Sequence, residues 1–125
     1  MILLLDSNPL LWALTEPEVL PSATREEVES AANDVVASVA SIWELEIKRA
    51  AGKLRLDVEL LPELERAGIG ILPITAADAT DAARLPVHHR DPFDRMVVAQ
   101  ARRLDAVVVT RDRIFERYGV DVLSA

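Results

Sequence analysis

The sequence predicts an α/β fold in three layers, with helices on both faces of a central, mainly parallel sheet of four to five strands. Short apolar runs rich in Val, Ile and Leu recur along the chain, which is typical of strands buried on both faces of a parallel sheet. Segments with helical spacing of apolar residues alternate with these runs. The longest apolar stretch falls far below the roughly 20 residues that span a bilayer, so no membrane partner is expected.

Five apolar runs are the predicted strands, at about residues 2–5, 35–39, 70–74, 106–109 and 120–123. The first run ends directly on Asp6, and Asp112 follows the fourth run. In a parallel sheet, ligands bind beyond the carboxyl ends of the strands. Both aspartates are therefore expected to face one crevice.

Two helices are predicted between the first and second strands. Asn8 is expected to cap the first of them, with Pro9 at its first helical position. The second should start near residue 22 or 24 and continue to about residue 32, because Thr24 and Glu27 have the spacing of a capping box.

Two more helices are predicted in the middle of the chain. The first spans residues 41–52, where Ser41 and Glu44 again have the spacing of a capping box and Gly52 provides the stop. The second lies within residues 57–67, starts late or kinks because of Pro62, and ends at Gly68.

The last part of the chain has the clearest helix signals. Thr75 and Asp78 form a further capping-box pair before an alanine-rich helix that stops ahead of Pro86. Asp91 precedes a helix predicted over residues 92–104, which has apolar residues at helical spacing. A short helical turn at 113–117 joins the last two strands.

Composition places the chain among small intracellular domains. Its 125 residues suit a single domain, residues 1–125, with a core of useful size. It contains no cysteine, which excludes disulfides and thiolate chemistry, and its first residues do not resemble a signal peptide. We therefore expect a cytoplasmic protein.

The charge distribution is uneven. The net charge of −7 argues against nucleic acid as a partner, but residues 88–118 hold seven arginines against five acids. These arginines lie beside the acidic residues discussed next, and they could equally be the solvated faces of helices. Those that we consider for RNA phosphates are Arg90, Arg95, Arg102, Arg103 and Arg111.

Four separate segments each bring one carboxylate to the carboxyl edge of the predicted sheet. These residues are Asp6, Glu44, Asp94 and Asp112, with Asp91 as a fifth candidate. Clustered carboxylates repel one another unless a cation neutralises them. Mg²⁺ and Mn²⁺ take oxygen ligands of this kind and support hydrolysis of phosphodiesters. The pattern therefore indicates a metal-dependent phosphodiesterase with Mg²⁺, or alternatively Mn²⁺, as cofactor.

Each acid also has an explanation that needs no function, because carboxylates are favoured at helix N-termini. Asp91 is better explained as a cap before Pro92, with Asp94 reaching back to it. For Glu44, the spacing supports a metal ligand and a helix cap equally. Asp112 could be a turn residue. Asp6 is the best metal-ligand candidate. Asn8 is expected to cap the following helix, so capping does not explain a carboxylate at the end of this buried strand.

The histidines and tryptophans are interpreted as residues without a catalytic role. His88 and His89 are adjacent and are the only histidines, so they are interpreted as surface loop residues. Trp12 and Trp43 lie on helix faces and are interpreted as core or partner-contact residues.

Four segments of the chain resemble one known family. They are MILLLDSN, SIWELEIKRAAGKL, LPVHHRDPFDRMVVAQA and VVVTRDRIFERYGV, and the second and third are the most specific in combination. The chain resembles the PIN-domain ribonucleases, in particular the VapC-type toxins of bacterial toxin-antitoxin pairs. The resemblance covers almost the whole chain and implies a PIN-like form of the predicted fold.

The resemblance implies a metal-dependent endoribonuclease that forms homodimers and is neutralised by a VapB-like antitoxin. By motif position, Asp6, Glu44 and Asp94 correspond to the three core metal-binding acids, which favours Asp94 over Asp91, and Asp112 corresponds to a more variable fourth. Antitoxins of this family lay a helical tail across the first helices and can insert an arginine into the acidic pocket.

Further positions also match the family, and one departs from it. Ser7 and Thr110 occupy the places of two hydroxyl residues beside the acids. Asn8 stands where many relatives have histidine. This departure leaves the role of position 8 open.

Two other classes of protein remain as alternatives. Phosphatases of the haloacid dehalogenase type need a second aspartate two residues after the first, where this chain has Asn8. Response-regulator receivers need an aspartate after the third strand, and residues 70–75 do not contain one. A PIN-like module that binds a partner without catalysis would not need all four acids.

Overall fold

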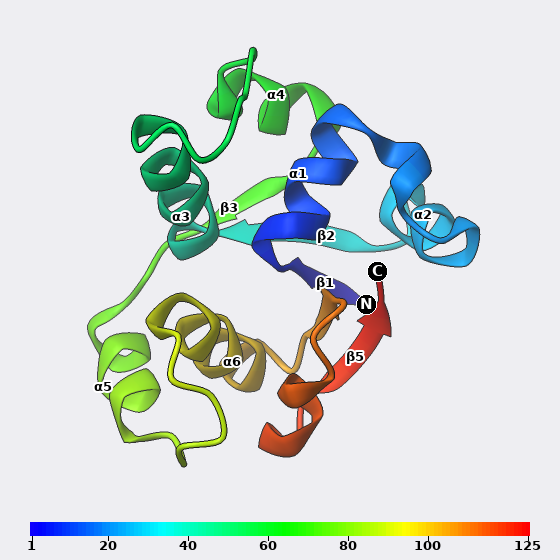
Figure 1. The fold of residues 1–125 in the computed structure, drawn as a ribbon. Coiled ribbons are helices and arrows are strands. Elements are labelled where there is room, and N and C mark those ends of the chain that lie inside the picture. The colour runs from blue at the N-terminus through cyan, green and yellow to red at the C-terminus, as the bar shows by residue number, and fades with distance from the viewer.

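The structure is a computed structural model that describes residues 1–125, and its centre is a five-stranded sheet in the order β3-β2-β1-β4-β5 (Figure 1). All neighbouring strands pair in parallel. This confirms the predicted α/β class. The strands are β1 (Ile2–Leu5), β2 (Asp34–Ser38), β3 (Gly70–Leu72), β4 (Val107–Thr110) and β5 (Asp121–Ser124).

Helices cover both faces of this sheet (Figure 1). One face carries α1 (Ser7–Thr15), η1 (Pro17–Val19), α2 (Ser22–Glu29), α3 (Val39–Ala50) and α4 (Leu60–Ala67). The other carries α5 (Ala76–Arg84), α6 (Pro92–Leu104) and the 3₁₀ segment η2 (Arg113–Tyr118).

The central strand β1 supplies both hydrophobic cores. Leu3 and Leu5 are fully buried in the core beneath α1, α3 and α4, whereas Leu4 is fully buried in the core beneath α6 and η2. Successive side chains of a strand point to opposite faces. A continuous apolar run is therefore what a strand covered on both sides requires.

Several predicted boundaries are confirmed. Helix α6 spans Pro92–Leu104 as expected, and α4 begins late and ends at Gly68, whose φ of 71° is left-handed. The predicted capping box of α5 is also present: Thr75 Oγ1 accepts from the Asp78 backbone N–H, and the Asp78 carboxylate accepts from that of Thr75.

Two predicted helix starts are wrong, and in each a residue earlier in the chain than predicted caps the first turn. Helix α1 begins at Ser7 and is capped by Asp6, so Asn8 lies inside the helix. Helix α3 begins at Val39 with Ser38 as its cap, not at residue 41. Asp6 directly follows β1 and Ser38 is the last residue of β2, so each helix begins where its strand ends.

The predicted start of α2 near residue 22 is confirmed, but its predicted capping box and its predicted end at about residue 32 are wrong. This helix begins at Ser22, with Pro21 at the cap position, and ends at Glu29. Thr24 does not form a capping box; its hydroxyl is buried and donates to the carbonyl of Ser124 on β5. A tertiary hydrogen bond has replaced the local one that the spacing suggested.

A buried carboxylate joins α5 to α6. Asp78 is only 1% exposed and accepts hydrogen bonds from Arg103 Nε at 2.6 Å and from Gln100 Nε2 at 3.2 Å. The hydrogen bond from Arg103 lowers the pKa of Asp78 to about 2. A buried charge is tolerated when it is paired in this way.

None of the helices combines the length and the apolar character that a bilayer-spanning helix needs.

Replacing Asp78 with alanine should lower the free energy of unfolding by about 2–3 kcal/mol, because Arg103 and Gln100 lose their shared acceptor. The loss should be smaller than for a fully buried ion pair, since Arg103 keeps 35% side-chain exposure. Urea unfolding measures it. Asp81→Ala on the exposed face of α5 is the control, and equal losses in the two variants would contradict the assigned role of Asp78.

Candidate functional site

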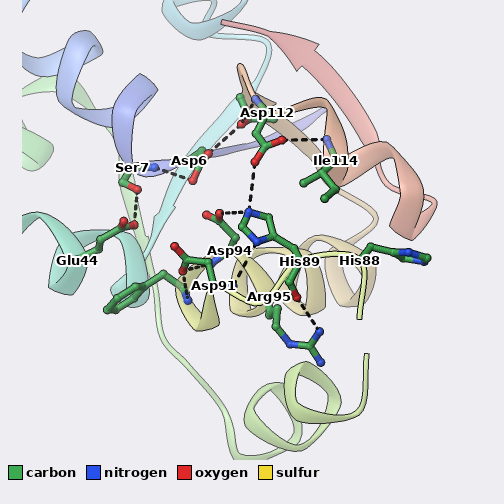
Figure 2. A network of polar contacts seen from close by, with 12 residues as sticks. Asp6, Ser7, Glu44, His88, His89, Asp91, Asp94, Arg95, Asp112 and Ile114 are labelled. Carbon is green, nitrogen blue, oxygen red and sulfur yellow. Dashed lines mark hydrogen bonds and ion pairs between the residues drawn. The ribbon is translucent and has the colours of Figure 1, made fainter. Parts of the chain in front are cut away.

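The four predicted acids converge at the carboxyl edge of the sheet (Figure 2). Asp6 follows β1, Glu44 lies in the second turn of α3, Asp94 lies in the first turn of α6, and Asp112 follows β4. Because β1, β2 and β4 are parallel neighbours, the segments that follow them emerge side by side. This pairing brings together Asp6, Glu44 and Asp112, and the N-terminus of α6 adds Asp94 from a fourth segment.

Asp6 is held at both carboxylate oxygens. Its Oδ1 accepts from the Ser7 backbone N–H at 2.9 Å, and its Oδ2 accepts from Thr110 Oγ1 at 2.8 Å. Asp6 therefore does cap α1, and the argument that Asn8 relieved it of this duty was wrong. The bond from Thr110 ties β1 to β4 across the sheet edge.

Ser7 connects Asp6 to Glu44. The Ser7 hydroxyl donates to Glu44 Oε1 at 2.5 Å, while Glu44 Oε2 pairs with Lys48 Nζ at 3.2 Å. Glu44 is five residues inside α3 and does not form the predicted capping box with Ser41, which is buried in the helix. Helix capping therefore does not explain Glu44. Its side chain is 13% exposed, and its carboxylate lies toward the site.

Asp91 and Asp94 have different roles. Asp91 Oδ1 accepts from the backbone N–H groups of Phe93 at 2.8 Å and Asp94 at 3.3 Å, so Asp91 is the cap of α6. The expected return bond from Asp94 is absent, because the Asp91 N–H donates to His89 Nδ1 instead. The Asp94 side chain is left to point into the site (Figure 2).

Asp112 is the most exposed of the four acids, with 45% side-chain exposure. Its Oδ1 accepts from the Ile114 N–H at 3.0 Å and so caps η2, and its own N–H donates to Thr110 Oγ1 at 3.0 Å. Thr110 thereby contacts both Asp6 and the segment that carries Asp112.

His89 is the residue at this site that the sequence interpretation missed. Its Nε2 lies 2.8 Å from Asp94 Oδ2 and 3.2 Å from Asp112 Oδ2, so it is not a free surface residue (Figure 2). Nitrogen and oxygen atoms of His89, Asp94 and Asp112 all lie within 4.8 Å of one another, close enough to share a metal ion. The sequence offered one signal that His89 belongs to the site, which is its position in the loop that leads into α6. His88, in contrast, packs its ring edge-on against Tyr118.

The electrostatics of the site favour a cation. Burial, together with repulsion from the neighbouring acids Asp6, Asp91, Glu44 and Asp112, raises the pKa of Asp94 to about 8. Burial also raises the pKa of Asp6, although hydrogen bonds from Thr110 and Ser7 oppose the shift. Oxygen-rich, electron-rich surroundings of this kind are what Mg²⁺ and Mn²⁺ bind.

Three of the five arginines considered for RNA already have partners inside the protein. Arg95 donates to five backbone carbonyls between residues 82 and 89, and Arg103 pairs with Asp78. Arg111 donates to the Ala125 carbonyl and lies 4.1 Å above the ring of Trp12. Arg90 and Arg102 are exposed and make no hydrogen bond or ion pair within the chain.

An aromatic pair stands at the rim of the site. Trp43 precedes Glu44, Phe93 precedes Asp94, and the two rings meet edge-on with centroids 5.4 Å apart. Trp43 is 59% exposed, which excludes the core and leaves partner contact of the two roles expected for it.

Several solved structures share this fold over nearly their full length. VapBC2 from Rickettsia felis, bound to a promoter DNA fragment, has a TM-score of 0.73 at 17% identity and covers 99% of this chain and 98% of its own. DNA-bound VapBC from Salmonella typhimurium has a TM-score of 0.69 at 20% identity, with the same coverages of 99% and 98%. FitAcB from Neisseria gonorrhoeae has a TM-score of 0.61 at 23% identity and covers 98% and 96%.

At these identities the structural similarity establishes the fold alone. Among proteins of curated function, none has a significantly similar sequence. The family model described as the PIN domain, however, matches residues 3–121. Since this match spans nearly the whole chain and agrees with the fold, the protein belongs to the PIN domain family.

Proposed function

We propose that this protein is a single-domain, metal-dependent endoribonuclease of the VapC type, which hydrolyses phosphodiester bonds in RNA. The observation that carries the proposal is the convergence of four carboxylates from four segments on one edge of the sheet. Most of these side chains are held by other residues of the site, which a chance cluster of surface acids would not require. A PIN-like module that only binds a partner would have no use for this arrangement.

Asp6, Glu44, Asp94 and Asp112 would hold the cation, which we take to be Mg²⁺ or Mn²⁺. When bound, such a cation supplies the Lewis acidity that makes attack of water on a phosphodiester possible at neutral pH. Ser7 and Thr110 orient the acids by donating to Glu44 and Asp6. Asp91 contributes indirectly, because it caps the helix that carries Asp94.

We further propose that the protein is a homodimer controlled by a VapB-like antitoxin. Its structural relatives from R. felis and S. typhimurium are VapBC assemblies bound to DNA. The antitoxin would use the cleft of about 500 Å³ between α1 and the segment before α4, which Leu11, Trp12, Leu14 and Leu54 help to line. An enzyme with cellular RNA as its substrate would act in the cytoplasm.

Asp94→Asn should abolish cleavage of RNA in Mg²⁺ or Mn²⁺ while the fold is retained, because the amide cannot neutralise a cation as the carboxylate does. The matched control is Asp91→Asn, since asparagine caps a helix as well as aspartate and activity should stay within about threefold of wild type. Gel assays on single-stranded RNA measure both. Full cleavage by folded Asp94→Asn would exclude the proposed mechanism.

Without metal, stability should fall as the pH rises from about 4 to 8. Asp94 keeps its proton in the folded protein up to a pKa of about 8, whereas the unfolded chain releases it near 3.8. The folded state then binds more protons than the unfolded state in this window, so each increase in pH favours unfolding. Melting temperatures in EDTA should therefore decline less for Asp94→Asn than for wild type, and parallel pH profiles would refute this.

Arg90 and Arg102 should contact RNA phosphates, because both are exposed and have no partner within the chain. Binding of single-stranded RNA to the Asp94→Asn protein should weaken with salt, and replacing both arginines with alanine should reduce the slope of log affinity against log salt by about 1.4, or about 0.7 for each phosphate contact. Arg66→Ala on α4 should leave the slope unchanged. An unaltered slope in the double variant would reject this role.

A further inference from the structure

The loop before α6 is fastened from two sides, and His89 lies at its end. The Tyr118 hydroxyl, on a buried side chain of η2, accepts from the N–H groups of His88 at 3.1 Å and His89 at 2.8 Å and donates to the Pro86 carbonyl at 2.9 Å. Arg95 on α6 donates to the carbonyls of His89 at 3.1 Å and Pro86 at 3.0 Å. This loop therefore has a defined position, although it lies outside the helices and strands.

The hydrogen bonds of the His89 ring assign its proton. A backbone N–H can only donate, so Nδ1, which lies 3.2 Å from the Asp91 nitrogen, must be an acceptor. The ring proton is then on Nε2, which faces Asp94 Oδ2 at 2.8 Å and Asp112 Oδ2 at 3.2 Å. One N–H group is thus shared between two carboxylates from different segments, and in this tautomer His89 is a donor to Asp94 and Asp112 instead of a third metal ligand beside them (Figure 2).

This shared donor matters most for Asp112. Asp112 lies on the segment after β4, is 45% exposed, and is repelled by Asp94. Its remaining hydrogen bonds are local: its N–H donates to Thr110 Oγ1, and its Oδ1 accepts from the Ile114 N–H. The Nε2–H of His89 draws Asp112 Oδ2 toward Asp94, while Asp94 Oδ1 makes no hydrogen bond within the protein and stays available as a ligand.

We propose that His89 is a positioning residue of the site: by donating Nε2–H to both Asp94 and Asp112 it holds these two acids in the arrangement that binds the catalytic cation. The inference rests on the proposed metal-dependent function and adds a residue to it. Partners that hydrogen-bond to ligating groups change metal affinity by about 10–100-fold when they are removed.

Two variants separate the two hydrogen bonds of the ring. In His89→Asn, the amide oxygen can still accept from the Asp91 N–H, but the side chain is too short to reach the carboxylates. In His89→Gln, the longer side chain carries an N–H group to the position of Nε2. Both variants lack the imidazole, so a difference between them reports on the N–H donor.

Calorimetric titration with Mn²⁺ is the main test, with melting temperatures in EDTA as the check on folding. We expect His89→Asn to bind Mn²⁺ at least about 10-fold more weakly than wild type and His89→Gln to remain within about threefold. RNA cleavage by His89→Asn should need correspondingly more Mn²⁺ and approach the wild-type kcat at saturation. Affinity of His89→Asn equal to or above wild type would overturn the inference, as would equal losses in both variants.

A failure of the proposed function has a different signature. If the wild-type protein bound no Mn²⁺ and cut no RNA, the metal-dependent mechanism would have failed. Crystal structures of wild type and His89→Asn would then test the inference on its own. It requires the Asp112 carboxylate to move away from Asp94 in the variant, and it is overturned if the two carboxylates keep their separation.

Discussion

The parallel pairing of all five strands is the constraint on which the rest of the structure depends. It sends the carboxyl ends of β1, β2 and β4 to one edge, and it requires helices on both faces to return the chain to the other edge. The central strand β1 stabilises this arrangement because its side chains fill both cores: Leu3 and Leu5 lie in one, and Leu4 lies in the other. The acidic site is built on this edge: Asp6 and Asp112 follow β1 and β4, Glu44 lies in the helix after β2, and the start of α6 brings Asp94 to the same edge.

Bringing carboxylates together has an electrostatic cost, and the protein offsets it with internal donors. Ser7 donates to Asp6 through its backbone and to Glu44 through its hydroxyl, and Thr110 donates to Asp6. Two basic groups, Lys48 and His89, stand beside Glu44 and Asp94. The pKa of Asp94 is still raised, so these donors reduce the repulsion without removing it, which leaves a role for a cation.

The arginines near the site illustrate how a charged side chain can be structural. Arg95 bonds to the carbonyl groups at the end of α5 and in the following loop, and Arg103 pairs with the buried Asp78. Both hold α5 against α6, and Arg95 also holds the loop that carries His89. The excess of positive charge in residues 88–118 therefore serves the architecture of the site as well as any contact with RNA.

The sequence by itself determined the α/β class, the order of the elements and the segments that bear the four acids. These follow from local patterns: apolar runs for buried strands, Thr75 with Asp78 for a helix start, and Gly68 for a helix end. The choice of Asp6 over Asn8 as the cap of α1 rests on a local bond to Ser7, and the sequence signals alone did not distinguish the two candidates. Only the tertiary structure decided the contacts between distant segments. Thr24 bonds to β5, Thr110 bonds to Asp6, and His89 reaches Asp112, because these groups come into range only after the strands have paired and the helices have packed.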